Sequence, residues 1–252
     1  MPRETAVRAT ALIRHNAVLL LRDPGALASR LILPLAFLVL LHPLYEAAQG
    51  RSAGISQAVI ATLVTFSLLG LSIVGGSILT DRMGRTWERV RATAARPAEA
   101  LAGKALPILG ALLAQQVLII GFGVLVLGLT VTSLPLLGLA VLAWTLTLLG
   151  LGAMIGVLAR SLSELSAAYD IGAMLLSSLG GALVPLASMP VWIRHVAPAS
   201  PGYWAVAALQ AALHDEASRT LLACAVLAGF AAAAALVTTS RVSRGGGRSA
   251  RL

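Results

Sequence analysis

Long apolar stretches alternate with short arginine-rich segments along this chain of 252 residues. A helix needs about 20 apolar residues to cross a hydrocarbon core that is roughly 30 Å thick. Six stretches have about this length, and polar residues such as His42, Glu46 and Asp170 rarely interrupt them. The predicted spans are 31–48, 55–80, 105–131, 134–159, 165–186 and 220–239. The pattern therefore predicts an all-α integral membrane protein with six transmembrane helices.

The composition agrees with this prediction. Residues of the set AVILMFWYC make up 58% of the chain and charged residues only 12%, with a mean hydropathy of +0.89. Soluble domains are roughly 45–50% apolar and about 25% charged. A soluble core of this size lacks the volume to hide so much apolar surface. These values exclude a soluble enzyme, a disordered chain and a disulfide-rich secreted domain; the single cysteine, Cys224, has no intrachain partner.

The distribution of basic residues predicts the orientation. If there are six spans, one side of the membrane holds sixteen of the 19 lysines and arginines, and the other side holds only Arg51, Arg194 and Arg219. Cytoplasmic loops carry the excess of basic residues, so both termini are expected to be cytoplasmic in a bacterial-type plasma membrane. The net charge of +9 is therefore read as membrane orientation and not as nucleic-acid binding. We expect the first apolar stretch to remain a span rather than a cleaved signal peptide, because about thirty residues with their own pattern precede it.

Residues 1–30 predict an amphipathic helix that lies in the inner membrane interface among lipid headgroups. Apolar residues from Ala9 to Leu20 recur at helical spacing, while Arg8 and Arg22 lie on the opposite side. This helix is either a simple anchor or has a further role.

The loop after the second span predicts a second amphipathic helix. Met83, Trp87 and Val90 form an apolar strip, and Arg82, Arg85 and Arg89 line another face. A short basic helix with an exposed aromatic residue suits a groove on a cytosolic partner. The alternative is a solvated loop that merely follows the positive-inside bias.

The segment between the fifth and sixth spans predicts re-entrant outer helices. Residues 191–196 and 203–213 are too short to span the bilayer but are strongly apolar, and prolines including Pro185 interrupt the segment. Irregular backbone at membrane depth must be buried in protein or line a wet cavity. The alternative is a plain surface loop.

The sequence offers no catalytic or metal-binding constellation, since its four histidines are scattered along the chain. Asp170 is the only carboxylate well inside a predicted span, although six residues after Glu164 it would lie towards the inner boundary. It either bonds to a neighbouring helix or belongs to a transport path. Glycines including Gly75, Gly152 and Gly156 allow helices to approach closely, within one chain or between two copies.

Three groups of residues carry a family resemblance. They are Leu21-Arg22-Asp23-Pro24 followed by Pro34; Asp81-Arg82-Met83-Gly84-Arg85-Thr86-Trp87-Glu88-Arg89 with Gly103-Lys104; and Pro185, Met189-Pro190-Val191-Trp192 and Pro201-Gly202-Tyr203-Trp204. In their order and spacing, the chain resembles the permease subunits of type-2 ABC exporters, including those for drugs, polysaccharides and lipids. The resemblance covers nearly the whole chain.

The resemblance implies one membrane domain over 1–252, with the interfacial helix at 1–30, a six-helix domain at 31–240 and a basic cytoplasmic tail at 241–252. It implies pairing with a second permease and with a cytosolic ATP-binding subunit. The expected contacts with that subunit are Asp81, Arg82, Gly84, Arg85, Trp87, Glu88 and Arg89, while Asp170 and Pro185 are expected in the path or in helix contacts.

The resemblance also implies a division of labour. The chain lacks the pattern G-x-x-x-x-G-K-[ST], so ATP and magnesium are expected on the partner, with no cofactor bound directly. The expected function is export of an amphipathic or hydrophobic substrate. The alternative is an ATP-independent membrane scaffold or a membrane-integral enzyme.

Overall fold

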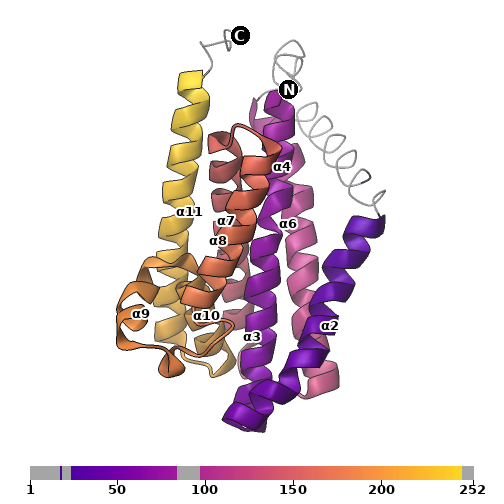
Figure 1. Ribbon diagram of the computed structural model, residues 1–252, viewed down its shortest axis with the longest axis vertical. Coiled ribbons are helices and arrows are strands. Elements are labelled where there is room, and N and C mark those ends of the chain that lie inside the picture. The colour runs from indigo at the N-terminus through magenta and orange to yellow at the C-terminus, as the bar shows by residue number, and fades with distance from the viewer. Residues whose placement is uncertain (1–17, 19–23, 84–96, 246–252) are drawn as a thin grey trace.

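The computed structural model describes residues 18, 24–83 and 97–245, and every regular element within them is helical. The elongated bundle is drawn in Figure 1. Its elements are α2 (Pro24–Gln49), α3 (Arg51–Leu69), α4 (Leu71–Met83), α6 (Pro97–Phe122), η1 (Gly123–Leu127), α7 (Leu134–Leu158), α8 (Leu162–Leu179), η2 (Leu186–Ser188), α9 (Val191–Val196), η3 (Ala197–Ala199), α10 (Pro201–Leu213) and α11 (Ala217–Gly245). The predicted all-α fold is confirmed for these residues.

Within the described residues, five helical stretches are long and apolar enough to cross a membrane. They are Leu31–Gln49, Arg51–Thr80, Ala105–Leu127, Leu134–Leu158 and Ala217–Arg241. These five match the first four predicted spans and the last one. The remaining predicted span corresponds to α8, which carries Glu164 and Asp170 and is not among the five. The count of six spans therefore stays a prediction.

Two predicted span boundaries are wrong, and glycines explain both. The stretch 165–186 is not one helix, because α8 ends at Leu179 and Gly181 takes a φ of 77°. The stretch 105–131 ends as a helix at Leu127, where the last turn is a π-helix and Gly128 follows with a φ of 79°. Glycine adopts such left-handed backbone angles without the steric cost of a β-carbon, so both sites end a helix readily.

The second span consists of two helices that meet at Gly70. The span over Arg51–Thr80 is the most buried of the five, with 78% of its window inside the protein. The Gly70 amide donates to the carbonyl of Phe66 at 3.2 Å, and α4 begins one residue later. A β-carbon on Gly70 would come within 2.7 Å of the Leu112 side chain on α6. The break therefore lies inside the core, where α3 packs against α2, α6, α8 and α10.

Helix α2 meets α3 at one end of the bundle and diverges from it towards Pro24 (Figure 1). The crossing is tight, since a β-carbon on Gly54 would come within 2.5 Å of the Glu46 Cα. Further along, the rings of Phe37 and Phe66 meet edge to face with centroids 5.3 Å apart. Only 17% of the α2 window is buried, so most of this helix presents apolar side chains to its surroundings.

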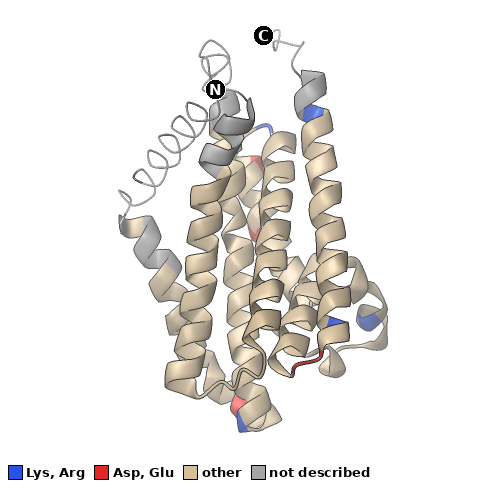
Figure 2. Cartoon of the chain, turned by 180° about the vertical axis from the view of Figure 1, so that it is seen from behind, with Lys and Arg blue, Asp and Glu red and all other residues tan. Residues whose placement is uncertain are grey.

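The described arginines lie near the two ends of the bundle (Figure 2). Arg160, between α7 and α8, and Arg241, on α11, share the end at which α4 finishes. Arg51 on the α2–α3 hairpin, Arg194 on α9 and Arg219 at the start of α11 are at the opposite end. The described arginines thus leave the middle of the bundle free of positive charge, whereas the carboxylate of Asp170 lies on α8 between the two ends.

Several predicted features fall partly or wholly outside the described residues. The interfacial helix over 1–30 is one, and α2 already begins at Pro24, where that helix was expected to stop. The tail over 241–252 is another, although α11 continues as a helix to Gly245.

Candidate functional site

The predicted coupling residues begin on the last turn of α4. Asp81 and Arg82 belong to this helix, which ends at Met83. The remaining five, Gly84, Arg85, Trp87, Glu88 and Arg89, lie outside the described residues. The structure therefore describes the helix that leads into the predicted coupling segment, and the contacts of that helix indicate where a movement of the segment would be felt.

Helix α4 packs most closely on α7, through the glycines that the sequence singled out. A β-carbon on Gly156 would come within 2.7 Å of the Gly75 Cα, and one on Gly152 would come within 2.7 Å of the Val74 Cβ. Helices approach this closely only where a side chain is absent. The Gly152–Gly156 pair is therefore occupied by a contact within the chain, whereas Gly76 has no atom within 4 Å of such a β-carbon.

Helix α4 also contacts α8, and the same glycine is central to the contact. The buried Tyr169 places its hydroxyl against the Gly75 backbone, at a position that a β-carbon would occupy. Gly75 thus lies between α7 on one side and α8 on the other. The sequence named Gly75 as a packing residue but did not indicate Tyr169, because a tyrosine in an apolar helix carries no pairing signal by itself.

Asp170 follows Tyr169 on α8 but points away from the packed face. The buried residues Leu165, Tyr169, Ala173 and Ser177 form one stripe of α8, and Asp170 is exposed beside it. Within the described part of the chain, nothing hydrogen-bonds or forms an ion pair with its carboxylate. The structural alternative, a bond from Asp170 to a neighbouring helix, receives no support from these residues.

The turn after α8 is held by polar side chains of three other helices. The Gln57 Nε2 on α3 donates to the carbonyl oxygens of Gly181 at 3.0 Å and Ala182 at 2.7 Å. The Tyr45 hydroxyl on α2 donates to the Leu183 carbonyl at 2.6 Å. The Gln210 Nε2 on α10 donates to the Gln57 Oε1 at 3.2 Å. We name this set, Tyr45, Gln57 and Gln210 with the 181–183 backbone, the outer tie.

The outer tie satisfies backbone carbonyls that would otherwise be buried without partners. A buried backbone group without a hydrogen-bond partner destabilises a protein by roughly 1–3 kcal/mol, and the cost is higher where no water can reach it. Pro185, predicted in the path or a helix contact, is half-buried just beyond the tie and precedes η2. Sequence reasoning missed Gln57 and Gln210, although an amide in an apolar helix is itself a signal of a helix-to-helix hydrogen bond.

Two short helices follow the outer tie, at the positions where the sequence predicted them. Helix α10 packs into the bundle against α3, α7, α8 and α11. Ser200 caps its start by accepting from the Gly202 amide at 3.2 Å and donating to the Leu176 carbonyl of α8 at 3.4 Å. A β-carbon on Gly180 would come within 2.6 Å of the Gly202 carbonyl carbon, so α8 ends directly against α10.

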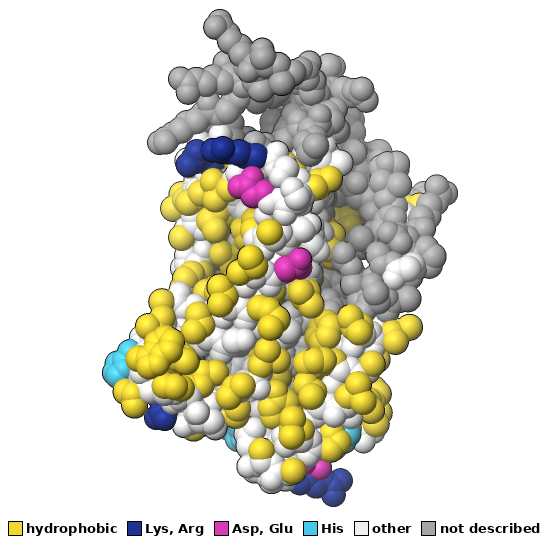
Figure 3. All heavy atoms as spheres, viewed as in Figure 1, with side chains coloured by type: hydrophobic (Ala, Val, Ile, Leu, Met, Phe, Trp, Pro, Cys, Tyr) yellow, Lys and Arg dark blue, Asp and Glu magenta, His cyan; other side chains and the backbone are white. Residues whose placement is uncertain are grey.

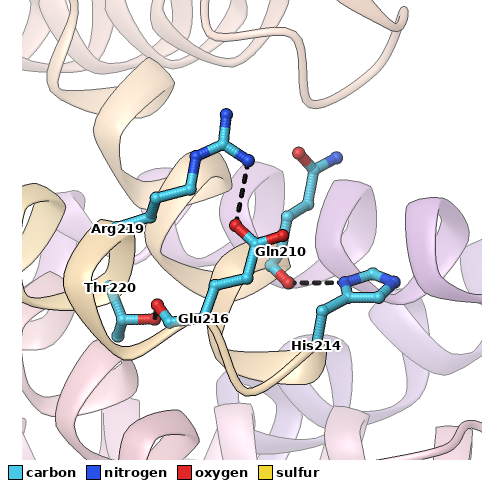
Figure 4. A network of polar contacts seen from close by, with 5 residues as sticks. All are labelled: Gln210, His214, Glu216, Arg219 and Thr220. Atoms are coloured by element: carbon cyan, nitrogen blue, oxygen red, sulfur yellow. Dashed lines mark hydrogen bonds and ion pairs between the residues drawn. The ribbon is translucent and has the colours of Figure 1, made fainter.

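A polar network closes α10 and opens α11 (Figure 4). The Arg219 guanidinium pairs with the Glu216 carboxylate at 2.9 Å, and the Thr220 hydroxyl donates to the Glu216 carbonyl at 3.0 Å. The His214 Nδ1 lies 2.8 Å from the Gln210 carbonyl oxygen. Exposed pairs of this kind contribute little energy. The arrangement is that of a helix-to-helix turn, and the described residues include no group of His, Cys, Asp and Glu able to hold a metal.

Comparison with known proteins confirms the family resemblance that the sequence shows. The sequence model described as "ABC-2 type transporter" matches residues 8–214, which include the predicted coupling segment, α8 and α10. No protein in the curated comparison matches the chain. The matched region covers most of the chain, and members of the family are membrane components of ABC transporters. The chain is thus a multi-pass membrane protein that belongs to the ABC-2 type transporter family.

Proposed function

We propose that this chain is the membrane-spanning permease subunit of an ATP-driven exporter that moves an amphipathic or hydrophobic substrate. In this proposal a separate cytosolic subunit binds ATP and magnesium, and two permease subunits pair around the path. The family membership supports the kind of partner, and the sequence features supply the coupling segment. The membrane is proposed to be a bacterial-type plasma membrane, with both termini cytoplasmic.

The observation that carries the proposal is the position of α4 between the coupling segment and the rest of the bundle. Asp81 and Arg82 lie on its last turn, and Gly75, two turns earlier, contacts both α7 and α8. Close-packed helices transmit a displacement because their contact leaves no void to absorb it. A push on residues 81–89 would therefore reach α8 and its exposed Asp170 through Gly75 and Tyr169.

Helix α8, which corresponds to the fifth predicted span, is proposed to cross the membrane between α7 and α10, and this brings the number of spans to six. It lies alongside α3 and α4 in the bundle (Figure 1). Its 18 residues give a length of about 27 Å, close to the hydrocarbon thickness. The charged residues that lower its mean hydropathy are those expected of a helix facing a path rather than lipid. With α8 as a span, Arg160 and Arg241 share the cytoplasmic side.

The short helices α9 and α10 are proposed to be re-entrant. Helix α10 is largely buried among four longer helices, which is the protein cover that non-spanning segments need at membrane depth. The outer tie joins the turn before these helices to α2 and α3. Opening of the path on the outer side would have to move α10, α8 and the α2–α3 hairpin together or break the tie.

The test is affinity purification of the tagged full chain from gently solubilised membranes, followed by identification of the proteins that accompany it. Recovery of a P-loop ATPase, and its loss in the variant Trp87→Ala/Glu88→Ala/Arg89→Ala, would support the proposal. A matched control, Arg241→Ala/Arg244→Ala/Arg248→Ala, removes basic charge from the tail on the same side and should retain the ATPase. A well-folded chain that reproducibly purifies without an ATPase would instead favour an ATP-independent scaffold or a membrane-integral enzyme.

A further inference from the structure

The predicted span 165–186 placed Asp170 towards the inner boundary, but α8 runs from Leu162 to Leu179, so Asp170 is an exposed carboxylate halfway along a helix of membrane-spanning length. It lies about 12 Å from the start of α8 and roughly 13 Å from its end at 1.5 Å per residue. The neighbouring positions one turn away on its side of the helix are Ser166, Ala167 and Met174, all exposed, and Met174 has 65% of its surface free. Figure 3 shows an acidic side chain among hydrophobic ones at mid-height on this face.

A charge at this depth needs a compensating group. An aspartate at the centre of a bilayer costs about 2.5–3.5 kcal/mol on insertion scales. Asp170 has no hydrogen-bond or ion-pair partner among the residues that the structure describes. The part of the chain that the structure describes therefore supplies no group that would neutralise this carboxylate.

The described arginines are poorly placed to supply that charge. Arg160 lies ten residues before Asp170, about 15 Å away along the helix axis. Arg241 lies at the same end of the bundle as Arg160. Arg51, Arg194 and Arg219 are at the opposite end (Figure 2). A second copy related by a twofold axis along the membrane normal would present the same arginines at the same depths. At the level of Asp170 it would add a second carboxylate instead.

We propose that Asp170 recognises the cationic group of an amphipathic organic cation, with Met174 and Ala167 in contact with the apolar part of the same molecule. This inference rests on the proposed export function and specifies its substrate class. Attraction between opposite charges grows as water is excluded, so one carboxylate on an apolar face selects strongly for a cation. Charge complementarity is the feature that separates this occupant from a neutral lipid.

The test measures binding to the purified full chain in phosphatidylcholine nanodiscs, with empty nanodiscs as background. The probe is tetraphenylphosphonium, and tetraphenylborate serves as an anion of the same shape. We expect saturable binding of the cation only. The variant Asp170→Asn should weaken it roughly tenfold or more, because the partner charge is lost. Asp170→Glu should retain it within about threefold, since the carboxylate is kept.

A matched control comes from the same helix. Glu164→Gln removes the other acidic residue of α8, which accepts from the Arg160 backbone amide at 3.0 Å near the helix start, and should leave cation binding unchanged. Equal binding of tetraphenylphosphonium to the wild type and Asp170→Asn would overturn the inference. Equal saturable binding of tetraphenylborate would also overturn it.

A second measurement covers the case in which Asp170→Asn fails to fold. In a Cys224→Ala background, Met174→Cys is labelled with a maleimide in the presence and absence of tetraphenylphosphonium. Protection by the cation and not by the anion supports the site, and unchanged labelling contradicts it. Neither assay requires an ATPase, so a positive result with a failed ATPase purification would keep the cation site and reject the exporter. A negative result beside a recovered ATPase would reject only the cation site.

Discussion

Gln57, on the second turn of the apolar helix α3, hydrogen-bonds across the bundle to the backbone of Gly181, 124 positions further along the chain. The Gln57 side chain is 4% exposed, and its amide also binds the Ala182 carbonyl. This contact joins the first third of the second span, near the α2–α3 hairpin, to the turn that separates α8 from the short helices. It makes the geometry of the segment between α8 and α11 depend on α3.

Gln57→Leu should destabilise the protein. The substitution keeps the side-chain volume similar but leaves the Gly181 and Ala182 carbonyls without their donor, at a cost of about 1–3 kcal/mol. We expect a lower midpoint of thermal unfolding for the purified full chain in detergent. Gln49→Leu, at the exposed end of α2, is the control and should leave the midpoint in place. If the two variants unfolded at the same temperature, the tie would contribute nothing.

The adjacent glycines Gly75 and Gly76 should respond to alanine with opposite signs. A β-carbon on Gly75 meets the Tyr169 hydroxyl and comes within 2.9 Å of the Gly152 carbonyl oxygen, so Gly75→Ala should cost about 1–3 kcal/mol. Gly76 has open space, and alanine in a helix is favoured over glycine by about 1 kcal/mol. Thermal unfolding of both variants under one condition checks the pair, and similar shifts would contradict the described packing of α4.

Removal of the Tyr169 hydroxyl should partly rescue Gly75→Ala. The hydroxyl oxygen is the nearest atom to the added methyl group, so the double variant Gly75→Ala/Tyr169→Phe should recover part of the lost stability. The interaction energy from the double-mutant cycle is expected at about 0.5–1 kcal/mol or more. If the two substitutions had additive effects, the strain caused by the added methyl group would come from its contact with the Gly152 carbonyl oxygen and not from Tyr169.

Ser200→Ala should loosen α10 from α8. The substitution removes the cap to the Gly202 amide and the bond to the Leu176 carbonyl, for a loss of about 1 kcal/mol. We expect faster hydrogen exchange of the first-turn amides of α10, measured by mass spectrometry on the full chain. Ser188→Ala, an exposed serine of η2, serves as the matched control. Unchanged exchange over Pro201–Leu213 in both variants would argue against a role for the cap.

Single cysteines can establish whether α8 crosses the membrane. Cys224 is the only cysteine and is 7% exposed, so Cys224→Ala gives a cysteine-free background at a small packing cost. Ser161→Cys and His214→Cys then report on the two sides of α8 and α10. If α8 spans, an impermeant maleimide added to intact cells should label position 214 and not 161. Labelling of both positions from one side would reduce the count to five spans.

The sequence predicted correctly those helices that are specified by the length of an apolar stretch alone. Leu134–Leu158 has no charged residue within it, and its observed bounds differ from the predicted 134–159 by a single residue. The segments 191–196 and 203–213 were also predicted as short helices, because they are apolar, too short to span and interrupted by prolines; the observed helices are Val191–Val196 and Pro201–Leu213. The length of an apolar stretch and the position of a proline are local properties, so both can be read directly from the sequence without any knowledge of tertiary contacts.

The sequence did not predict where a helix ends inside an apolar run, because that depends on backbone angles. Gly128 turns with positive φ, whereas Gly76 and Gly152 continue a helix, and nothing in their immediate neighbours distinguishes them. It also did not predict which glycines face a helix within the chain, since that requires the rotation of α4 and α7 about their axes.

By itself, the sequence determined that this is a membrane protein. It also determined which side of the predicted spans carries the basic charge, and which family the motifs indicate. Those conclusions follow from transfer free energy and charge, which accumulate residue by residue. Only the tertiary structure decided that Gly75 contacts both α7 and α8, that Gln57 holds the turn at Gly181, and that Asp170 faces away from the packed helices. Those relationships depend on which faces of distant helices meet, and packing of the whole bundle sets them.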